Sequence, residues 1–251
     1  MGAEIMTSKI CLVTGVGGAT GAAISRRFAR DGYQVAMLAR NRDRLDHLQR
    51  QIDGSKAYVC DVGDLETLAN TIAAVRADLG KPSIVVHNAV SATFGTFLEA
   101  DPAELERNFR VNTTALLHLA RELAPDMVGA GGGAIVVTGN TSSLRGVPKY
   151  ALFAPTKAAQ RILAEALARD LGPRRVHVGY VTIDGAIDAP WLSEGGRSPP
   201  AWWAPPTDWS RSPAEWFVEP DAIAEEVFRI AHQHPSAWTF DIVIRPFAEK
   251  W

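Results

Sequence analysis

Short β-branched runs alternate along this chain with longer segments whose apolar residues recur at helical spacing. The runs cover residues 10–14, 34–38, 57–60, 84–87, 134–138, 176–182 and 239–244, and the helical segments cover residues 20–30, 42–52, 65–79, 102–128, 151–171 and 221–232. Such an alternation predicts a parallel sheet with helices on both faces. The runs are apolar throughout, which is typical of strands that are covered on both sides. We therefore expect an α/β fold, a doubly wound parallel sheet of about seven strands. Asp64 and Asp101 precede two of the helices and suit their N-caps.

The composition favours one domain and a small-molecule partner. A chain of 251 residues with 47% hydrophobic and 22% charged residues can bury a full core, so we expect a single domain over residues 1–251. The net charge of -2 gives no basic excess for nucleic acid or a membrane. No transmembrane run or secretory signal is present, which predicts a cytoplasmic protein. Cys11 and Cys60 fit neither a disulfide framework nor a zinc site, so we expect buried thiols and no metal.

A glycine-rich segment joins the first strand to the first helix. It reads Gly15-Val16-Gly17-Gly18-Ala19-Thr20-Gly21. Glycine permits a positive φ and lets backbone amides approach a pyrophosphate, which then lies at the positive end of the helix dipole. A plain tight turn is the alternative, but the strand, turn and helix are the context that a dinucleotide site requires. We therefore predict a Rossmann-type fold with cofactor contacts from Gly15, Gly17, Gly18, Ala19, Thr20 and Gly21.

Two arginines follow the second strand. The chain continues Ala39-Arg40-Asn41-Arg42, where an NAD site places a carboxylate for the ribose 2′-hydroxyl. The guanidinium groups of Arg40 and Arg42 suit a 2′-phosphate, whose charge a carboxylate would repel. This pattern predicts NADP(H) in preference to NAD(H). The alternative is a pair of solvated arginines at the start of a helix.

Several motifs follow in the order typical of the short-chain dehydrogenase/reductase family. The segment Thr14 to Gly21 resembles its TGxxxGxG turn with Ala19 for the middle glycine, Asp61-Val62 resembles its adenine-contacting pair, and His87-Asn88-Ala89-Val90 resembles its NNAG motif. The resemblance covers nearly the whole chain and implies cofactor contacts from Asp61, Val62, Asn88, Ala89 and Val90. Asn112 matches the helix asparagine that holds a water of the family's proton relay. A structural role is the alternative, because a polar side chain on an apolar helix needs a partner.

The match departs from the family at the chemistry. In the family a serine polarises the carbonyl, a tyrosine transfers the proton, and a lysine lowers the pKa of that tyrosine and holds the nicotinamide ribose. Lys157 matches the lysine, but Phe153 stands at the tyrosine position and Asn140 at the serine position. A phenyl ring has no proton to donate, whereas an asparagine amide still donates a hydrogen bond. A small shift of the alignment would bring a hydroxyl from Thr141, Ser142 or Ser143 to the serine position.

The source of the transferred proton stays open. Tyr150 precedes Phe153 by one helical turn, although a surface tyrosine at a helix start is the alternative. Asp184 and Asp188 lie beside the turn that resembles the family's proline-glycine turn, where the family positions the nicotinamide carboxamide with residues that match Gly185 and Ile187. Partial burial would raise the pKa of a carboxyl group there, whereas aspartates also commonly cap turns. A water held by Asn112 and Lys157 is a further source.

The chain is also similar to a subgroup of short-chain reductases with phenylalanine for the tyrosine. Residues 188–217, rich in tryptophan and proline, predict a substrate loop or, as the alternative, part of a subunit interface. We expect an NADP(H)-dependent oxidoreductase that transfers hydride to a small apolar or aromatic substrate with a C=O, C=N or activated C=C bond. The missing phenol favours C=N and C=C, which need no protein acid at oxygen. The other hypothesis is a catalytically inactive NADP(H)-binding sensor or assembly protein. The resemblance implies a homodimer or homotetramer formed through the helices at 102–128 and 151–171.

Overall fold

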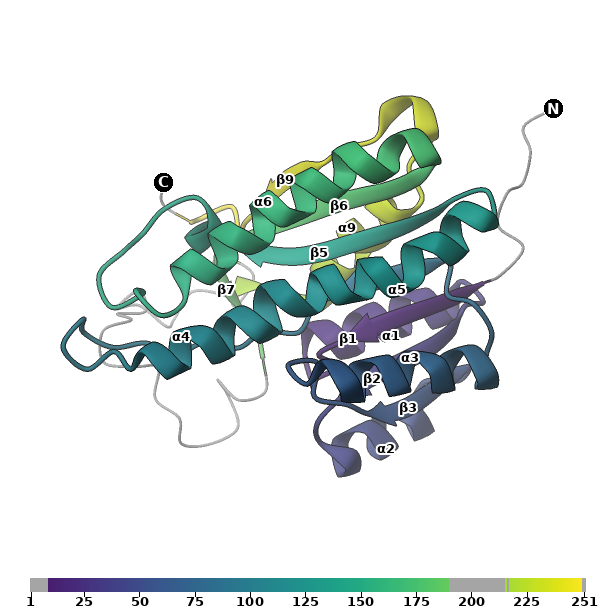
Figure 1. Ribbon diagram of the computed structural model, residues 1–251, viewed down its shortest axis with the longest axis horizontal. Coiled ribbons are helices and arrows are strands. Elements are labelled where there is room, and N and C mark those ends of the chain that lie inside the picture. Colours follow the sequence, from purple (N-terminus) through teal and green to yellow (C-terminus); the bar gives the residue numbers. More distant parts are fainter. Residues whose placement is uncertain (1–8, 190–214, 216, 250–251) are drawn as a thin grey trace.

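The computed structural model describes residues 9–189, 215 and 217–249. Within these residues, parallel strands form a seven-stranded sheet in the order β3-β2-β1-β4-β5-β6-β9 (Figure 1). The strands are β1 (Ile10–Thr14), β2 (Gln34–Ala39), β3 (Ser55–Val59), β4 (Ile84–His87), β5 (Gly133–Asn140), β6 (Val176–Ile183) and β9 (Asp241–Ile244). The predicted Rossmann-type fold is confirmed. The strand order reverses between β1 and β4, and ligands of such sheets bind beyond the carboxyl ends of the strands at that reversal.

Helices cover both faces of the sheet (Figure 1). One face carries α3 (Leu65–Asp78), α5 (Ala115–Gly129) and α6 (Ala154–Leu171), and the other carries α1 (Thr20–Arg30), α2 (Arg42–Gln51) and α9 (Pro220–Ala231). Strand β1 shows why its sequence is apolar throughout. Leu12 belongs to the core under α3 and α5, whereas Cys11 and Val13 belong to the core under α1 and α9. Every residue of β1 is therefore buried, and Cys11 is a free thiol as predicted.

The helix predicted over residues 102–128 is divided in the structure. It consists of α4 (Pro102–Phe109), a π-helical segment (Arg110–Thr114) and α5. Asn112 lies in the π-helical segment, and its side chain makes hydrogen bonds with residues outside this helix. Single π-helical turns inside α-helices are frequent at functional sites. The predicted segment is helical throughout, but the π-helical turn within it was not predicted, because apolar periodicity does not report the tertiary partners of one buried asparagine.

Smaller differences occur at the ends of elements. Helix α6 begins at Ala154 and not at residue 151, with Pro155 in its first turn, a position that proline favours. A short parallel pair, β7 (Ala186–Ile187) and β8 (Phe217–Val218), was not predicted. The N-caps are confirmed, since Asp64 accepts hydrogen bonds from Glu66 N and Thr67 N, and Asp101 accepts one from Ala103 N. Most of the predicted substrate loop, residues 190–214 and 216, lies outside the described residues.

Among the described residues, no helix combines the length and apolar character that a membrane crossing needs. Those residues also contain no group of three or more histidine, cysteine, aspartate or glutamate side chains that could hold a metal ion.

Candidate functional site

The turn between β1 and α1 has a backbone that only glycine accommodates at two positions. Gly15 has a φ of 68°, and a Cβ on it would lie 2.5 Å from Ala89 Cα. A Cβ on Gly21 would lie 2.6 Å from the Gly15 carbonyl oxygen. Helix α1 begins without a side-chain cap, so its first N–H groups have no partner from a capping side chain. A tight turn that leads into an uncapped helix N-terminus fits the pyrophosphate of a dinucleotide.

Asn88 and Thr14 fix this turn across the point where the strand order reverses. The Thr14 hydroxyl oxygen accepts hydrogen bonds from the backbone N–H groups of Asn88 and Ala89, both at 3.2 Å. The Asn88 amide donates to the Gly15 carbonyl at 3.0 Å and accepts from the Thr138 hydroxyl at 3.1 Å. Residues at the ends of β1, β4 and β5 therefore hold the glycine turn from one side. Asn88 and Ala89, two of the residues that the sequence assigns to the cofactor, lie directly against Gly15.

His87 connects the same turn to the π-helical segment. Its Nδ1 lies 3.1 Å from the Thr14 hydroxyl, and its Nε2 lies 3.3 Å from the Asn112 carbonyl oxygen. A carbonyl oxygen only accepts, so Nε2 carries the proton and Nδ1 accepts from Thr14. Burial, with a smaller contribution from the charge of Lys157, lowers the pKa of His87 to about 4. The imidazole is therefore neutral at physiological pH and acts as a fixed link.

Two arginines lie beyond the carboxyl end of β2, as predicted, but they differ in their surroundings. Arg40 is exposed, and in the described part of the chain no carboxylate lies within ion-pair distance of it. Arg42 is also exposed but lies 3.6 Å from Asp46, one turn further along α2. The two guanidinium groups thus differ, because among the described residues Arg42 has a carboxylate within ion-pair distance and Arg40 has none.

The residues predicted to contact adenine have a mixed environment. Asp61 is exposed, and its carboxylate accepts a hydrogen bond from Gly63 N at 2.9 Å, which shapes the turn after β3. Val62 is buried in the core, and Val90 is 58% exposed. Both the Asp61 carboxylate and the Val90 side chain are thus accessible from outside the core.

Lys157 is buried in the first turns of α6. Its side chain is 2% exposed, and its Nζ donates to the Thr138 carbonyl at 3.2 Å and to Gln160 Oε1. Burial lowers the pKa of Lys157 to about 7. The Thr138 hydroxyl also donates to Asn88, so Thr138 connects Lys157 to the side chains that hold the glycine turn.

All the hydrogen-bonding groups of the Asn112 side chain are used within the protein. Its Nδ2 donates to the Ser91 carbonyl and to the Thr156 hydroxyl, both at 2.8 Å, and its Oδ1 accepts from Ser91 N at 2.9 Å. Its backbone carbonyl receives Gln160 Nε2 at 2.6 Å. The structural role that the sequence left as an alternative is therefore present. Gln160 is a polar residue of this network that sequence reasoning missed, and its only signal was a glutamine one turn after Lys157 in the predicted helix.

Phe153, at the position where the family has its tyrosine, packs against two other aromatic side chains. Phe153 is 3% exposed, and its ring centroid lies 5.4 Å from that of Phe94 and 6.1 Å from that of Tyr150. Phe94 and Tyr150 lie 4.8 Å apart. Tyr150 lies four residues before the start of α6 and so does not belong to the helix, as it would if the helix began before it. Its ring still contacts that of Phe153. Burial raises the pKa of Tyr150, which makes it a weaker acid.

The end of β5 provides both an amide and hydroxyl groups. The Asn140 side chain accepts a hydrogen bond from Ser142 N at 3.2 Å and caps the short helix Thr141–Ser143. The Ser143 hydroxyl donates to the Asn140 carbonyl at 2.7 Å. Ser143 also interacts with the phenol of Tyr180, a fully buried residue of β6. Asn140 and Ser143 thus lie together. The Ser143 proton is used by the Asn140 carbonyl, whereas the Asn140 side-chain NH₂ remains a hydrogen-bond donor beside the end of β5.

The turn after β6 is held by the C-terminal segment. Asp184 N donates to the Ile244 carbonyl at 2.8 Å, and a Cβ on Gly185 would lie 2.7 Å from Pro246 Cδ. The Asp184 carboxylate lies 3.4 Å from Arg245 Nη1 and 4.0 Å from Arg145 Nη2. These two guanidinium groups give the Asp184 carboxylate an ion-pairing role.

The second aspartate of this turn has a different position. Asp188 is exposed, and its backbone N–H donates to the Val218 carbonyl at 3.1 Å. The preceding residue, Ile187, pairs with Val218 in the short β7–β8 ladder. Gly185 therefore lies between β6 and β7, Ile187 lies within β7, and Asp188 lies at the surface.

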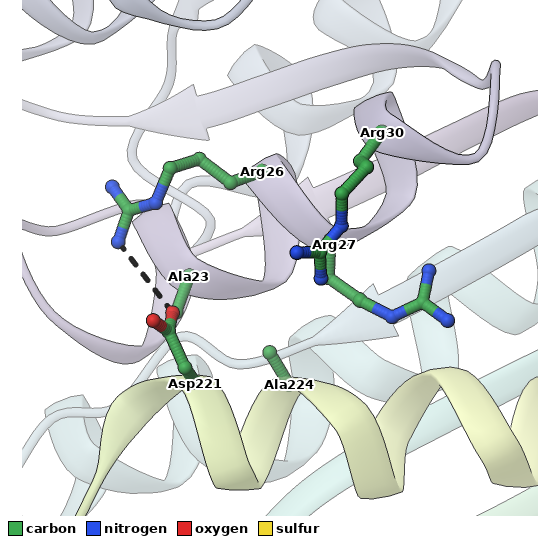
Figure 2. Close-up of a pocket in the computed structure, with 6 residues that line it drawn as sticks. All are labelled: Ala23, Arg26, Arg27, Arg30, Asp221 and Ala224. Atoms are coloured by element: carbon green, nitrogen blue, oxygen red, sulfur yellow. Dashed lines mark ion pairs between the residues drawn. The ribbon is translucent and has the colours of Figure 1, made fainter.

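A separate pocket of about 420 Å³ lies between α1 and α9 (Figure 2). Its polar lining consists of Arg26, Arg27, Arg30 and Asp221. Arg26 lies 3.8 Å from Asp221, and Arg27 pairs with Glu225 at 2.5 Å. Carboxylates therefore balance two of the three arginines, and the pocket lies away from the glycine turn, along the later turns of α1.

The fold and the glycine turn define a dinucleotide-binding protein of the doubly wound α/β class. Residues 9–194 match the family model described as short chain dehydrogenase. Versicolorin reductase 1 of Aspergillus parasiticus is 34% identical over 187 residues, which are 72% of this chain and 71% of the relative. The chain belongs to the short-chain dehydrogenase family and is an oxidoreductase of that family.

Solved structures share the whole fold. A short-chain dehydrogenase from Rhodopseudomonas palustris is 26% identical with a TM-score of 0.77, and the match covers 95% of this chain and 98% of the other. L-Sorbose reductase from Gluconobacter frateurii, solved with NADPH and L-sorbose, is 22% identical with a TM-score of 0.83 over 98% of each chain. The latter likeness concerns the fold alone.

Proposed function

We propose that this protein is an NADP(H)-dependent oxidoreductase that transfers hydride between the cofactor and a small organic substrate with a C=O, C=N or activated C=C bond. The observation that carries the proposal is a continuous set of buried hydrogen bonds that begins at Thr14 in the glycine turn. It runs through His87, Asn112 and Gln160 to Lys157. These contacts hold the lysine at a fixed place relative to the turn. The bound cofactor supplies the hydride, and the protein supplies orientation, which alone contributes several kcal/mol to a barrier.

NADP(H) is the proposed cofactor, in preference to NAD(H). The support is Arg40, which is exposed and has no carboxylate partner among the described residues, at the end of the strand where a 2′-phosphate would lie. The Gluconobacter frateurii reductase with the same fold was solved with NADPH. The proposed cofactor contacts are Gly15, Gly17, Gly18, Ala19, Thr20, Gly21, Arg40, Arg42, Asp61, Val62, Asn88, Ala89, Val90, Lys157, Gly185 and Ile187.

An apolar or aromatic substrate fits the side chains around the aromatic trio of Phe94, Tyr150 and Phe153. Large apolar side chains near these segments are exposed, namely Phe97, Leu98, Leu144 and Val147. Apolar surface with few polar groups is typical of small-molecule sites. The residues proposed to act there are Lys157, Asn112, Asn140, Phe153, Tyr150, Asp184 and Asp188, of which Asn112 and Asp184 act by holding their neighbours.

The substrate classes are ranked by their need for a proton. An iminium ion is already protonated and an activated C=C bond takes its proton at carbon from solvent, whereas a reduced ketone leaves an alkoxide. Phe153 has no acidic proton, and Asp184 is paired with two arginines. We therefore propose C=N and activated C=C substrates ahead of ketones, and membership of a subgroup with phenylalanine at the tyrosine position.

We also propose one domain over residues 1–251, a cytoplasmic location, and a homodimer or homotetramer. The outer faces of α5 and α6 expose Leu117, Val128 and Ile162, with Ile162 60% exposed. Apolar side chains in such a row are suited to contact with a second copy. Light scattering at micromolar concentration measures the mass, and a monomer mass would contradict the assembly.

The test of the proposed function is NADPH oxidation with one substrate of each class: a cyclic iminium ion, an enone and an aromatic ketone. We expect turnover with the first two. Gly21→Ala should abolish cofactor binding, because its Cβ would lie 2.6 Å from the Gly15 carbonyl, whereas Gly129→Ala, with no atom within 4 Å of its Cβ, is the matched control. NADPH binding without turnover of any of the three would indicate the inactive sensor or assembly protein instead.

A further inference from the structure

Gln160 uses both ends of its side-chain amide in the buried centre of the site. The residue is 0% exposed. Its Nε2 donates to the Asn112 carbonyl at 2.6 Å, and its Oε1 accepts from Lys157 Nζ and, at 3.4 Å, from the Tyr180 hydroxyl. The contacts reach the π-helical segment, the lysine on the same helix and β6. One amide thus connects three elements around Lys157.

The orientation of this amide follows from its neighbours. The Asn112 carbonyl can only accept a hydrogen bond, so the NH₂ group of Gln160 must face it. The carbonyl end of the amide then faces Lys157 and Tyr180, both of which donate. In this orientation every one of the three partners, Asn112, Lys157 and Tyr180, forms a donor–acceptor pair with the amide.

A glutamine at this position needs a reason. Thr156 and Ala164, one turn before and one turn after it on the same helix face, are also fully buried. Burying an amide costs free energy unless its groups are hydrogen-bonded, and an apolar side chain would fill a core position without that requirement. Gln160 meets the requirement only through the three partners named above, so its contribution depends on Lys157 being there.

Lys157 is left with one donor free by this arrangement. An ammonium group has three N–H donors and no acceptor. In the described chain, the Thr138 carbonyl and Gln160 Oε1 take two of them. The third has no protein acceptor among those residues, and Thr138 lies next to Gly139 at the carboxyl end of β5, the edge at which the glycine turn also lies.

We propose that Gln160 is a positioning residue for Lys157, whose amide oxygen favours the charged form of the lysine and holds it so that one N–H remains for a hydroxyl of the cofactor ribose. This inference rests on the proposed function for the identity of the ligand. The hydrogen bond between the amide and the lysine does not depend on it.

Few titratable groups face Lys157. His87 on β4 is neutral because burial lowers its pKa to about 4, and Tyr180 on β6 is neutral because burial raises its pKa. The π-helical segment and β5 present carbonyl oxygens from Asn112 and Thr138. With no carboxylate bonded to Lys157 in the described chain, Gln160 Oε1 and the Thr138 carbonyl are the groups that offset burial, which lowers the pKa of Lys157 to about 7.

The direct test is the titration of Lys157 by NMR in protein labelled with ¹³C at lysine Cε, without cofactor. Its signal is the one missing from Lys157→Met. In Gln160→Met the midpoint should fall by roughly one pH unit, because a hydrogen bond to the charged form is lost. In Gln160→Glu, which keeps an acceptor oxygen, the midpoint should not fall. Gln160→Asn keeps the amide but shortens its reach and should also lower the midpoint, which covers the case in which Gln160→Met does not fold.

Gln233→Leu is the matched control. The Gln233 amide also makes two hydrogen bonds, both to Thr239, at 2.7 and 3.0 Å, but in the loop before β9. Its removal should leave the Lys157 midpoint unchanged. A fall in both Gln160→Met and Gln160→Glu, or in neither, would overturn the proposal, because a structural role alone does not distinguish an acceptor oxygen from a thioether.

The second readout is NADPH affinity, measured by cofactor fluorescence. Gln160→Met should weaken NADPH binding several-fold, with a larger effect at higher pH where the lysine loses its charge. If the unmodified protein binds no NADPH, the proposed function fails, and the titration still decides the role of Gln160. If NADPH binds and the variants bind it equally well at all pH values, the ribose contact is wrong.

Discussion

Asn112 Nδ2 donates a hydrogen bond to the Thr156 hydroxyl at 2.8 Å, which joins the π-helical segment to the first turn of α6 immediately before Lys157. The same side chain also accepts a hydrogen bond from the Ser91 backbone N–H and donates one to the Ser91 carbonyl. Asn112 is therefore a clamp between the loop after β4 and the helix that carries the lysine. Its carbonyl is bound by His87 and Gln160, so the segment is fixed at both its side chain and its backbone.

Because of these hydrogen bonds, we expect Asn112→Leu to lower the stability of the fold strongly. The variant loses three hydrogen bonds and leaves partly buried Ser91 backbone groups and the buried Thr156 hydroxyl without this partner, so the free energy of unfolding should fall by about 3 kcal/mol or more. Urea unfolding measures it. Asn70→Leu, at an exposed position on α3, is the control and should change stability by less than about 0.5 kcal/mol. A small change in the free energy of unfolding for Asn112→Leu would show that these hydrogen bonds contribute little to stability.

Arg40 should decide the choice of cofactor. We expect the unmodified protein to bind NADPH more tightly than NADH, and Arg40→Asp to reverse the preference, because attraction at the 2′-phosphate becomes repulsion. The ratio of the two dissociation constants should change by roughly a hundredfold, which corresponds to a coupling of ~3 kcal/mol. Arg50→Asp makes the same charge change at the other end of α2 and should leave the ratio unchanged. Equal binding of both cofactors by the unmodified protein would refute the prediction.

Lys157 should make stability depend on pH in a defined window. Its pKa is about 7 in the folded protein against 10.5 for an ordinary lysine, so between these pH values the unfolded chain binds more protons and the folded state gains stability as pH rises. The destabilising effect of the buried lysine is therefore complete below pH 7 and disappears toward pH 10.5. The Lys157→Met variant has no titrating group at this position and serves as the reference. The stability of the unmodified protein relative to this variant should rise by up to ~1.4 kcal/mol per pH unit within the window. A pH-independent difference would mean that Lys157 has an ordinary pKa.

We expect Tyr150 to have no general-acid role in the reduction of an iminium ion, which is already protonated. Its ring packs on Phe94 and Phe153, and burial raises its pKa. With an iminium substrate, Tyr150→Phe should leave kcat within roughly threefold, which steady-state kinetics measures. A fall by roughly 10²–10⁴, the usual contribution of a positioned acid, would instead assign the proton transfer to Tyr150.

Restoring the family's residues should create ketone reduction. Phe153→Tyr supplies a phenol beside Lys157, and Asn140→Ser restores a hydroxyl at the end of β5. We expect the double variant to reduce an aromatic ketone at least roughly tenfold faster than the unmodified protein, because a general acid becomes available. Phe94→Tyr adds a phenol to the same aromatic trio at another position and is the control. No gain in the double variant, with NADPH still bound, would show that the substrate does not lie beside residue 153.

The fold was predictable from the sequence because strands that are buried on both faces are apolar over consecutive residues. Strands β1 and β4 have the predicted bounds, since each is a short run of mainly apolar residues ended by glycine or asparagine. Helix α1 also has its predicted bounds, because its apolar residues recur at helical spacing up to Asp31. The glycine turn was predictable for a related reason, because positive φ and close backbone approach exclude other residues at Gly15 and Gly21.

The sequence by itself determined the strand pattern, the helix layers, the glycine turn and the absence of a phenol at residue 153. Only the tertiary structure decided that Asn112 lies in a π-helical segment, that Asp184 pairs with Arg145 and Arg245, and that Gln160 holds Lys157 against the Asn112 carbonyl. The reason is physical. Apolar periodicity reports which side of an element is buried, whereas a hydrogen bond between Asn112 and Thr156, 44 residues apart, depends on how the elements pack.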